Sequence, residues 1–435
     1  MKPKWQLLFF TLAHIVIFLI LFKSVLYDQR FNASALYFDY ASRAIHGQIP
    51  YQDFPLEYPP LALVFFILPR LLAPNLLNYT LAFTALILVF NLVGLFFIEA
   101  ISRRLGISAG KALTFYTIAL LGIGSIMDMR YDLIPAVIVL VALYALITGK
   151  TAWAFALLAV GTLTKIYPVV LAPIFVLYYF RQKQYRPMLS GAAVFAGVAI
   201  LMSLPFIIMA PSGFWESFAY HAKRGLQLES TYASILLLGY TLRLIPVQLE
   251  FSYGSWNLAG TLPDILAGLS TFLVIAALLG VYWLYYRNHP AEKAKDPFYF
   301  EVSNLDAAYI LNYSTLAILA FMVPGKVLSP QFLVWLYPMV PLIMGPWRPG
   351  SWLTFVLISL MSYYIFPLHY LELLGFQRAA VDVLLWRNLL LAGFAGILLW
   401  KSTGHQIKLP DEYAVISENM EEVPDAQSCT FRDRR

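Results

Sequence analysis

Carboxylates and aromatic rings gather in the segment that follows the first long apolar run. Four acids lie within residues 28–58 among tyrosines and phenylalanines, namely Asp28, Asp39, Asp53 and Glu57. Acids beside aromatic rings suit a site that binds a sugar and removes a proton from a hydroxyl. An ordinary interfacial belt of aromatic residues with solvated acids is the alternative. Asp53 and Glu57 stand among prolines at the expected membrane surface, so for these two a functional role and the interfacial alternative are both open.

Basic side chains recur in four further motifs. The motifs are Asp128-Met-Arg-Tyr-Asp132, Thr164-Lys-Ile-Tyr-Pro168, Tyr220-His-Ala-Lys-Arg-Gly-Leu-Gln-Leu-Glu-Ser230 and Pro324-Gly-Lys-Val-Leu-Ser-Pro-Gln331. Charges at membrane depth are costly and mark candidate functional sites. We predict that a set of six residues clamps a phosphate or pyrophosphate: Arg130, Lys165, His221, Lys223, Arg224 and Lys326. Each lysine or arginine alone could instead extend to lipid headgroups, but five clusters on one face favour a site.

The composition places these motifs in a membrane protein. Of 435 residues, 60% are hydrophobic and 12% are charged, about half the charged fraction of a soluble domain. Apolar runs long enough to cross a bilayer follow one another along the chain. The net charge of +6 is dispersed between these runs, which argues against a nucleic-acid partner.

The apolar runs predict twelve spans with both termini in the cytoplasm. The expected spans are 5–27, 77–100, 112–127, 133–149, 152–164, 166–181, 188–209, 263–286, 305–323, 330–346, 351–368 and 382–400. Basic residues then alternate between the two faces as the positive-inside rule requires. This alternation holds only if residues 59–72 form a helix on the outer membrane surface. The four basic motifs and the acidic segment all fall on the outer face.

The predicted fold class is an all-α polytopic membrane protein with one transmembrane domain, residues 1–400. Two large outer loops, residues 28–76 and 210–262, are where a site is expected. Residues 401–435 form a polar tail that we expect to be disordered in the cytoplasm.

Other chemistries find no support in the sequence. The single cysteine, Cys429, and six histidines without ligand spacing give no zinc signature. There is no P-loop and no nucleotide-binding glycine motif. We expect no cofactor and no metal. His14 is predicted to be a packed core histidine, and Arg387 to be a structural or headgroup-facing arginine.

The motifs resemble those of glycosyltransferase family 87. The resemblance runs from about residue 28 to about residue 345 and is carried by Pro50-Tyr-Gln-Asp-Phe-Pro-Leu-Glu-Tyr-Pro-Pro60, Arg130-Tyr-Asp132, Lys165-Ile-Tyr-Pro168, Arg224-Gly-Leu-Gln-Leu-Glu-Ser230 and Gly325-Lys-Val-Leu-Ser-Pro-Gln331. This family has the GT-C architecture and includes polyprenol-phosphate-mannose-dependent mannosyltransferases.

The resemblance implies a bundle of about twelve transmembrane helices with outer surface helices and an outer-facing active site. It implies inverting transfer of a hexose, with mannose expected, from a polyprenyl-phosphate donor to a lipid or glycan acceptor. An outer-loop carboxylate would act as base, and the phosphate would leave without an acid or a metal. Asp132, Glu229 and Gln331 join the six residues named above as donor-binding candidates.

One position departs from the family pattern. An aspartate typically precedes the first-loop tyrosine by about four residues, but Asn32-Ala-Ser-Ala-Leu-Tyr37 contains no acid. The base is therefore expected at Asp39, Asp53 or Glu57. A non-catalytic glycolipid-binding homologue and a transporter of lipid-linked sugars are the alternatives, although a transporter favours polar residues at the bilayer midplane.

Overall fold

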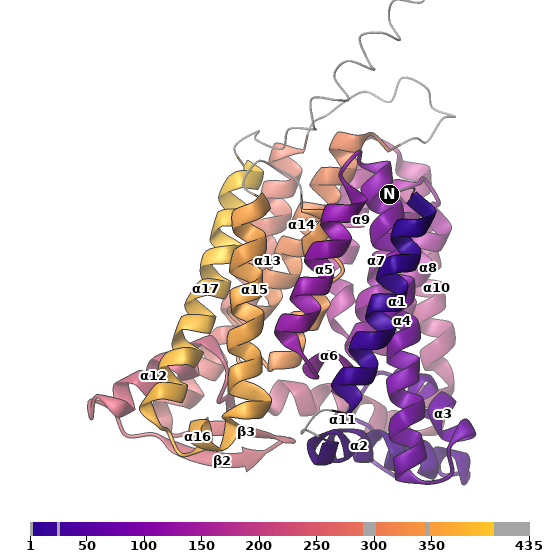
Figure 1. Ribbon diagram of the computed structural model, residues 1–435. Coiled ribbons are helices and arrows are strands. Elements are labelled where there is room, and N and C mark those ends of the chain that lie inside the picture. Colours follow the sequence, from indigo (N-terminus) through magenta and orange to yellow (C-terminus); the bar gives the residue numbers. More distant parts are fainter. Residues whose placement is uncertain (1–2, 24–26, 290–301, 344–347, 404–435) are drawn as a thin grey trace, which may run out of the picture.

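Long helices run side by side between the two ends of the molecule (Figure 1). The computed structural model describes residues 3–23, 27–289, 302–343 and 348–403. The bundle helices are α1 (Pro3–Phe22), α4 (Leu76–Arg104), α5 (Ala109–Ile123), α7 (Leu133–Ile147), α8 (Thr151–Thr164), α9 (Ala172–Arg181), α10 (Tyr185–Met209), α13 (Thr261–Asn288), α14 (Asn304–Met322), α15 (Arg348–Tyr363) and α17 (Arg378–Thr403). Within the described part of the chain, seven helices are long and apolar enough to cross a membrane. The protein is therefore a multi-pass membrane protein, as predicted.

Shorter elements cover one end of the bundle, and we call them the loop layer (Figure 1). They are α2 (Tyr27–Ile45), α3 (Ala62–Leu72), α6 (Ile126–Met129), α11 (Pro211–Lys223), α12 (Thr231–Thr241), α16 (Tyr370–Leu374) and the strands β1 (Leu226–Gln227), β2 (Gln248–Ser252) and β3 (Ser255–Ala259). The strands form an antiparallel sheet in the order β1-β3-β2. Thus the two segments expected as large outer loops fold at the same end of the bundle.

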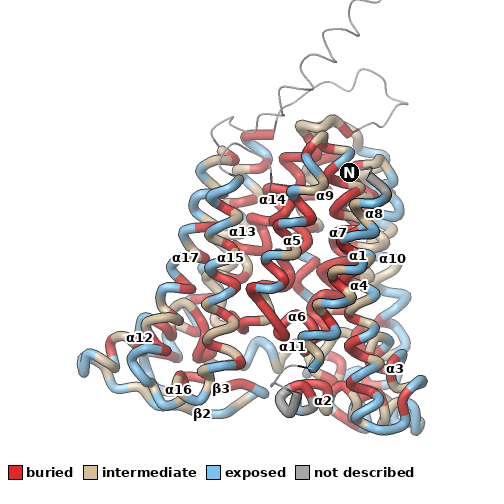
Figure 2. The backbone as a smooth tube through the Cα atoms, viewed as in Figure 1, coloured by how far each residue is buried: buried red, intermediate tan, exposed pale blue. Residues whose placement is uncertain are grey.

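Burial distinguishes central helices from peripheral ones (Figure 2). Helix α7 is buried along nearly its whole length, whereas Gly191 and Ser203 are the buried positions of α10. Both helices are apolar on all sides, because lipid tails are as apolar as the protein interior. Their positions in the bundle therefore depend on packing and not on an amphipathic pattern.

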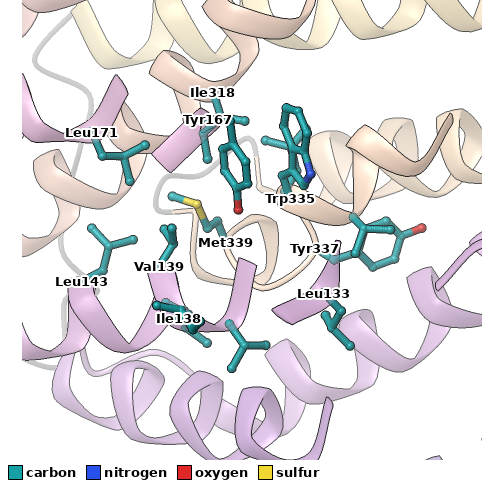
Figure 3. Close-up of a cluster of buried hydrophobic side chains, with 14 of the residues drawn as sticks. Leu133, Ile138, Val139, Leu143, Tyr167, Leu171, Ile318, Trp335, Tyr337 and Met339 are labelled. Carbon is teal, nitrogen blue, oxygen red and sulfur yellow. The ribbon is translucent and has the colours of Figure 1, made fainter. Parts of the chain in front are cut away.

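The predicted tenth span is not an α-helix. Residues 330–343 contain two short 3₁₀-helices, η2 (Pro330–Trp335) and η3 (Val340–Leu342). Pro330, Pro338 and Pro341 lack the backbone N–H that a continuous α-helix needs. The segment is nevertheless interior, since Trp335 is 2% exposed and its ring stacks on Tyr167 with 4.1 Å between centroids (Figure 3). The Trp335 ring also stacks on Phe332 at 4.1 Å.

Two further interruptions of the helices lie at Lys165 and at residues 364–368. Lys165 has extended backbone angles and separates α8 from the 3₁₀-helix η1 (Tyr167–Leu171), which leads into α9. A π-helical segment, η4 (Tyr364–Leu368), connects α15 to α16. Residues 401–403 continue α17, and the remainder of the predicted tail lies outside the described residues.

A buried polar network connects α1, α4 and α5. His14 is fully buried, and its ring nitrogens are 2.9 Å from Thr117 Oγ1 and 2.8 Å from Asn91 Nδ2. Tyr116 donates to Asn91 Oδ1 at 2.8 Å. The prediction of a packed core histidine is confirmed.

Helix α11 lies directly against the first loop of the loop layer. A Cβ atom added to Gly213 would be 1.9 Å from the backbone oxygen of Tyr51. The Tyr51 ring also meets Phe214 and Phe206 edge-on, at 5.5 and 5.7 Å between centroids. Only glycine permits this approach without a backbone shift.

We predict that Gly213→Ala destabilises the protein by about 1–3 kcal/mol, because the new methyl group forces α11 away from the loop. Gly268→Ala is the matched control, since it lies in α13 with no atom within 4 Å of the added Cβ. Alanine is about 1 kcal/mol better than glycine in a helix, so the control should be neutral or stabilising. Thermal unfolding in detergent measures both, and equal melting temperatures for the two variants would contradict the close contact.

Candidate active site

A buried ion pair lies where α7 begins and α8 ends. Lys165 Nζ donates to Asp132 Oδ1 at 2.5 Å, and Trp335 Nε1 donates to the same oxygen at 2.7 Å. The Lys165 ammonium is also 4.8 Å from the ring centre of Tyr131 and 5.5 Å from that of Phe332. Burial lowers the pKa of Lys165, and the Asp132 carboxylate opposes that shift. Aromatic rings and one carboxylate thus hold a cation at the edge of the bundle.

Arg130 lies beside this pair and contacts α2. Its guanidinium is hydrogen-bonded to the hydroxyl of Tyr37, whose ring stacks on Phe66 at 4.4 Å. The Nε atom of Arg130 is buried and has no hydrogen-bond partner among the described residues. An ion pair between Arg30 and Asp128, both buried, attaches α2 to α6 and so positions Tyr37.

Glu57 is the acid that the fold brings to the basic residues. Its carboxylate is hydrogen-bonded to the Tyr220 hydroxyl. It also lies close enough to oppose the lowering of the Lys165 pKa, after Asp132, and to add to the rise in the Tyr131 pKa that burial causes. His221 Nε2 is 2.8 Å from the backbone oxygen of Glu57, which joins α11 to the first loop. Burial raises the pKa of Tyr220, with Glu57 the next cause.

The other two candidate bases, Asp39 and Asp53, each interact with a residue four positions away in the sequence. Asp39 pairs with Arg43 one turn later at 2.8 Å, and both side chains are about half exposed. Asp53 is exposed, and its Oδ2 accepts from the Ile49 N–H at 2.7 Å, closing its own turn. Neither has a described contact with the basic motifs.

A second basic group comes from the segments at 224 and 326. Lys326 Nζ donates to the backbone oxygen of Ala222 at 2.7 Å, and Arg224 is near enough to lower the pKa of Lys326, although burial is the larger cause. Burial likewise lowers the pKa of His221. The buried Nε of Arg224 has no partner within the described part of the chain.

Gln227 fixes the segment at 326 against β1. Its backbone N–H donates to the Lys326 oxygen, its Oε1 accepts from the Leu328 N–H at 2.9 Å, and its Nε2 donates to Ser329 Oγ at 2.6 Å. Two predicted residues are not drawn into the cluster by any described contact. Lys223 is exposed, and Gln331 is partly buried in η2.

A third polar group lies between β1 and α17. Glu229 is 3% exposed and is hydrogen-bonded to Tyr370. Burial raises the pKa of its carboxyl, while Arg387 and Arg224 act in the opposite direction. Arg387 Nη2 donates to the backbone oxygen of Glu229 at 3.2 Å. Glu229 Oε2 and two Arg387 nitrogens, Nε and Nη1, are buried without a partner among the described residues.

Sequence patterns did not single out several members of this site. Tyr220, Tyr370 and Trp335 each hydrogen-bond a predicted carboxylate, yet single aromatics in an aromatic-rich chain carry no distinguishing signal. Arg387 is 0% exposed, so it does not extend to headgroups and the structural alternative holds. Its position in the middle of an apolar run was the available signal.

The arrangement suits an anionic ligand next to a carboxylate. Unpartnered, buried guanidinium atoms of Arg130, Arg224 and Arg387 come from three different segments, and lysines 165 and 326 add charge. Among the described residues, no group of three or more histidine, cysteine, aspartate or glutamate side chains is placed to hold a metal ion.

The family model of glycosyltransferase family 87 matches residues 56–296, more than half of the chain. The chain belongs to this family. It is therefore a membrane glycosyltransferase of the class that the sequence motifs indicated. The match includes Glu57, Arg130, Lys165 and Glu229, and it begins after Asp39 and Asp53.

Comparisons with individual proteins add less. No curated protein matches the sequence. Among solved structures, the chain is similar to ArnT from Cupriavidus metallidurans in the apo state, with 14% identity and a TM-score of 0.41, over 96% of this chain and 80% of that one. The GT-C architecture follows from family membership, and the helical bundle with its loop layer agrees with it.

We predict that Asp132→Ala destabilises the protein by about 2–3 kcal/mol, because Lys165, whose side chain is 15% exposed, remains largely buried without its partner. The matched control is Asp39→Ala, which removes an exposed i,i+4 pair worth about 0.5 kcal/mol or less. Thermal or chemical unfolding of the purified protein in detergent measures the difference. Similar stability of the two variants would mean that the Lys165–Asp132 pair is not buried.

Proposed function

We propose that this glycosyltransferase transfers a hexose, with mannose as the first candidate, from a polyprenyl-phosphate donor to a lipid or glycan acceptor. The supporting observation is that Glu57, hydrogen-bonded to Tyr220, lies within electrostatic range of Lys165 in a loop layer that also holds unpartnered buried arginines. A carboxylate beside a cationic pocket is what an acceptor hydroxyl and a phosphate-linked donor require.

In the proposed reaction Glu57 removes the proton from the acceptor hydroxyl. The hydroxyl oxygen attacks the anomeric carbon from the face opposite the phosphate, so the new glycosidic bond forms as the bond to phosphate oxygen breaks, with inversion. The electron pair of that bond remains on the phosphate, which leaves as a stable anion. Arg130, Arg224 and Lys326 stabilise the added negative charge.

The remaining residues have supporting roles in this proposal. Asp132 positions Lys165, which contributes charge to the donor pocket, and His221 holds the backbone at Glu57. The unpartnered oxygen of Glu229 is suited to accept from sugar hydroxyls. Lys223 and Gln331 belong to the same motifs, and we place them at the margin of the donor site.

We propose that the loop layer lies on the outer face of the membrane, with both termini in the cytoplasm. The basic residues between the apolar runs support this orientation, because their alternation follows the positive-inside rule. The donor and acceptor would then both be reached from the membrane surface, where the apolar polyprenyl chain can stay in the bilayer.

One observation favours a second candidate, a non-catalytic homologue that binds glycolipid. The residue four positions before Tyr37 is Ala33, which is buried beside Met129. If catalysis requires a carboxylate at this position, this chain lacks the catalytic base. A transporter is disfavoured, since its substrate site is expected near the bilayer midplane, whereas Glu57 and the basic motifs belong to the loop layer and to the helix ends beside it.

We predict that Glu57→Gln lowers transfer about 100- to 10,000-fold, the usual contribution of a general base. Asp39→Asn and Asp53→Asn are the controls. The asparagine of Asp53→Asn can still accept the Ile49 N–H that Asp53 accepts, and Asp39 is about half exposed, so both variants should fold. The measurement is transfer of radiolabelled mannose from polyprenyl-phosphate-mannose into host lipid extract, by protein in nanodiscs with and without EDTA. A base at Asp39 or Asp53 would reverse this pattern, and wild-type protein that binds donor without transfer would support the non-catalytic candidate.

We also predict that Arg130→Ala and Arg224→Ala each raise the donor concentration needed for half-maximal rate by about tenfold or more. A hydrogen bond to a charged group contributes about 1.5–3 kcal/mol. The acceptor requirement should change less. Arg43→Ala, which removes an exposed arginine elsewhere in the loop layer, is the control, and an unchanged donor titration for both Arg130 and Arg224 variants would exclude them from the phosphate site.

A further inference from the structure

A separate cavity lies at the far end of α12, away from Glu229. Its volume is about 640 Å³, and its walls include Tyr240, Thr241, Arg243, Leu244, Phe376 and Arg378. These residues come from the end of α12, the loop after it, the loop between α16 and α17, and the start of α17. Helix α12 has 11 residues, which separates the cavity from Glu229 by about 16 Å. Cavities of about 300–1,000 Å³ are the usual size for small-molecule sites.

Two wall residues have a backbone conformation that side chains disfavour. Arg243 has φ of 60° and Phe376 has φ of 54°, and they are two of the five non-glycine residues with positive φ in the described part of the chain. Such backbone conformations cost about 1–3 kcal/mol each and cluster at ligand-binding sites. Here they come from two distant segments and meet at one cavity.

The cavity carries unneutralised positive charge. Arg378 Nε is 2.8 Å from both oxygens of Asp382, and its Nη1 is 3.4 Å from Thr241 Oγ1. The Arg243 backbone N–H donates to the Tyr240 oxygen at 2.8 Å, but the Arg243 guanidinium has no hydrogen-bond or ion-pair partner among the residues that the structure describes. Arg378 is also the first residue of the 26-residue helix α17, whose N-terminal dipole adds to the positive potential. The charges of Arg378 and Asp382 cancel, so the Arg243 guanidinium and the helix dipole remain for a ligand.

Apolar groups border the charged wall. Tyr240 and Phe376 meet edge-on at 5.0 Å, and the neighbouring leucines 242 and 244 are 50% and 75% exposed. Exposed leucines at the rim of a membrane protein belong in the hydrocarbon region, so a ligand that reaches the arginine from this side has apolar chains beside its charged head.

We propose that this cavity binds the phosphate headgroup of an anionic membrane lipid, at a site distinct from the donor pocket. The Arg243 guanidinium and the start of α17 hold the phosphate, and the lipid chains lie along the exposed leucines. Helix α12 begins two residues after Glu229 and ends at the cavity. Helix α16 contains Tyr370, the hydrogen-bond partner of Glu229, and ends shortly before Phe376 in the cavity wall. A lipid bound in the cavity would therefore stabilise both helices that position Glu229 and Tyr370.

The test is native mass spectrometry of the full-length protein in detergent, titrated with dioleoyl-phosphatidylglycerol. We expect Arg243→Gly, which suits the left-handed backbone but removes the guanidinium, to weaken binding at least tenfold. Arg243→Asn is a second variant that tolerates this backbone, and thermal unfolding checks that both fold. Arg43→Gln, which removes an exposed arginine from the same loop layer, should bind as the wild type does.

Equal lipid binding by the wild type and both Arg243 variants would overturn the proposal. Full competition by inorganic phosphate at the concentration of the lipid would also overturn it, because the site would then recognise free phosphate and not a lipid. The measurement involves no sugar transfer, so its outcome is independent of the proposed enzymatic function.

Discussion

Asp132 holds together three segments that meet at the loop-layer end of the bundle. One of its oxygens accepts from both Lys165 and Trp335, which lie at the end of α8 and in η2. A carboxylate removed from water is stable only when such donors replace its hydration. Helix α7 begins directly after Asp132, and α8 ends directly before Lys165. The positions of Arg130, Tyr131 and the first loop follow from it, because Tyr131 packs against Lys165, Tyr58 and Phe66.

The sequence predicted the class and the family because both depend on local patterns. Apolar runs gave the helical bundle, and motif strings such as Gly325-Lys-Val-Leu-Ser-Pro-Gln331 indicated the family. The same patterns could not separate Glu57 from Asp39 and Asp53. That distinction depends on where α11 brings Tyr220 and on local contacts that occupy the other two acids. The assignment of a base remains a prediction.

The residues of the candidate site that the sequence did not predict are those held by contacts between distant segments. Arg387 lies in an apolar run, and nothing near it in the sequence identifies Glu229, 158 residues earlier, as its neighbour. Tyr370 follows the cis peptide bond between Phe366 and Pro367, and its partner is the same glutamate. In contrast, the error over residues 330–343, where no continuous α-helix forms, was local. Three prolines announced a broken helix, but hydropathy, which ignores backbone hydrogen bonding, still counted a span.

The irregular segment from η2 to η3 has a consequence for how the chain lies in the membrane. Its backbone lacks a continuous helical ladder: the backbone hydrogen bonds close short turns, such as Tyr337 N–H to the Val334 oxygen, and a side chain from another helix adds to them. Trp352 Nε1, for example, donates to the Val340 oxygen at 3.1 Å. A segment of this kind cannot stand alone in lipid, because unsatisfied peptide groups there cost several kcal/mol each. In the folded protein this segment is enclosed instead by neighbouring helices, since η2 packs against α7 and α15, and η3 packs against α4 and α5. The irregular backbone is thus compatible with the bilayer because protein, and not lipid, surrounds it.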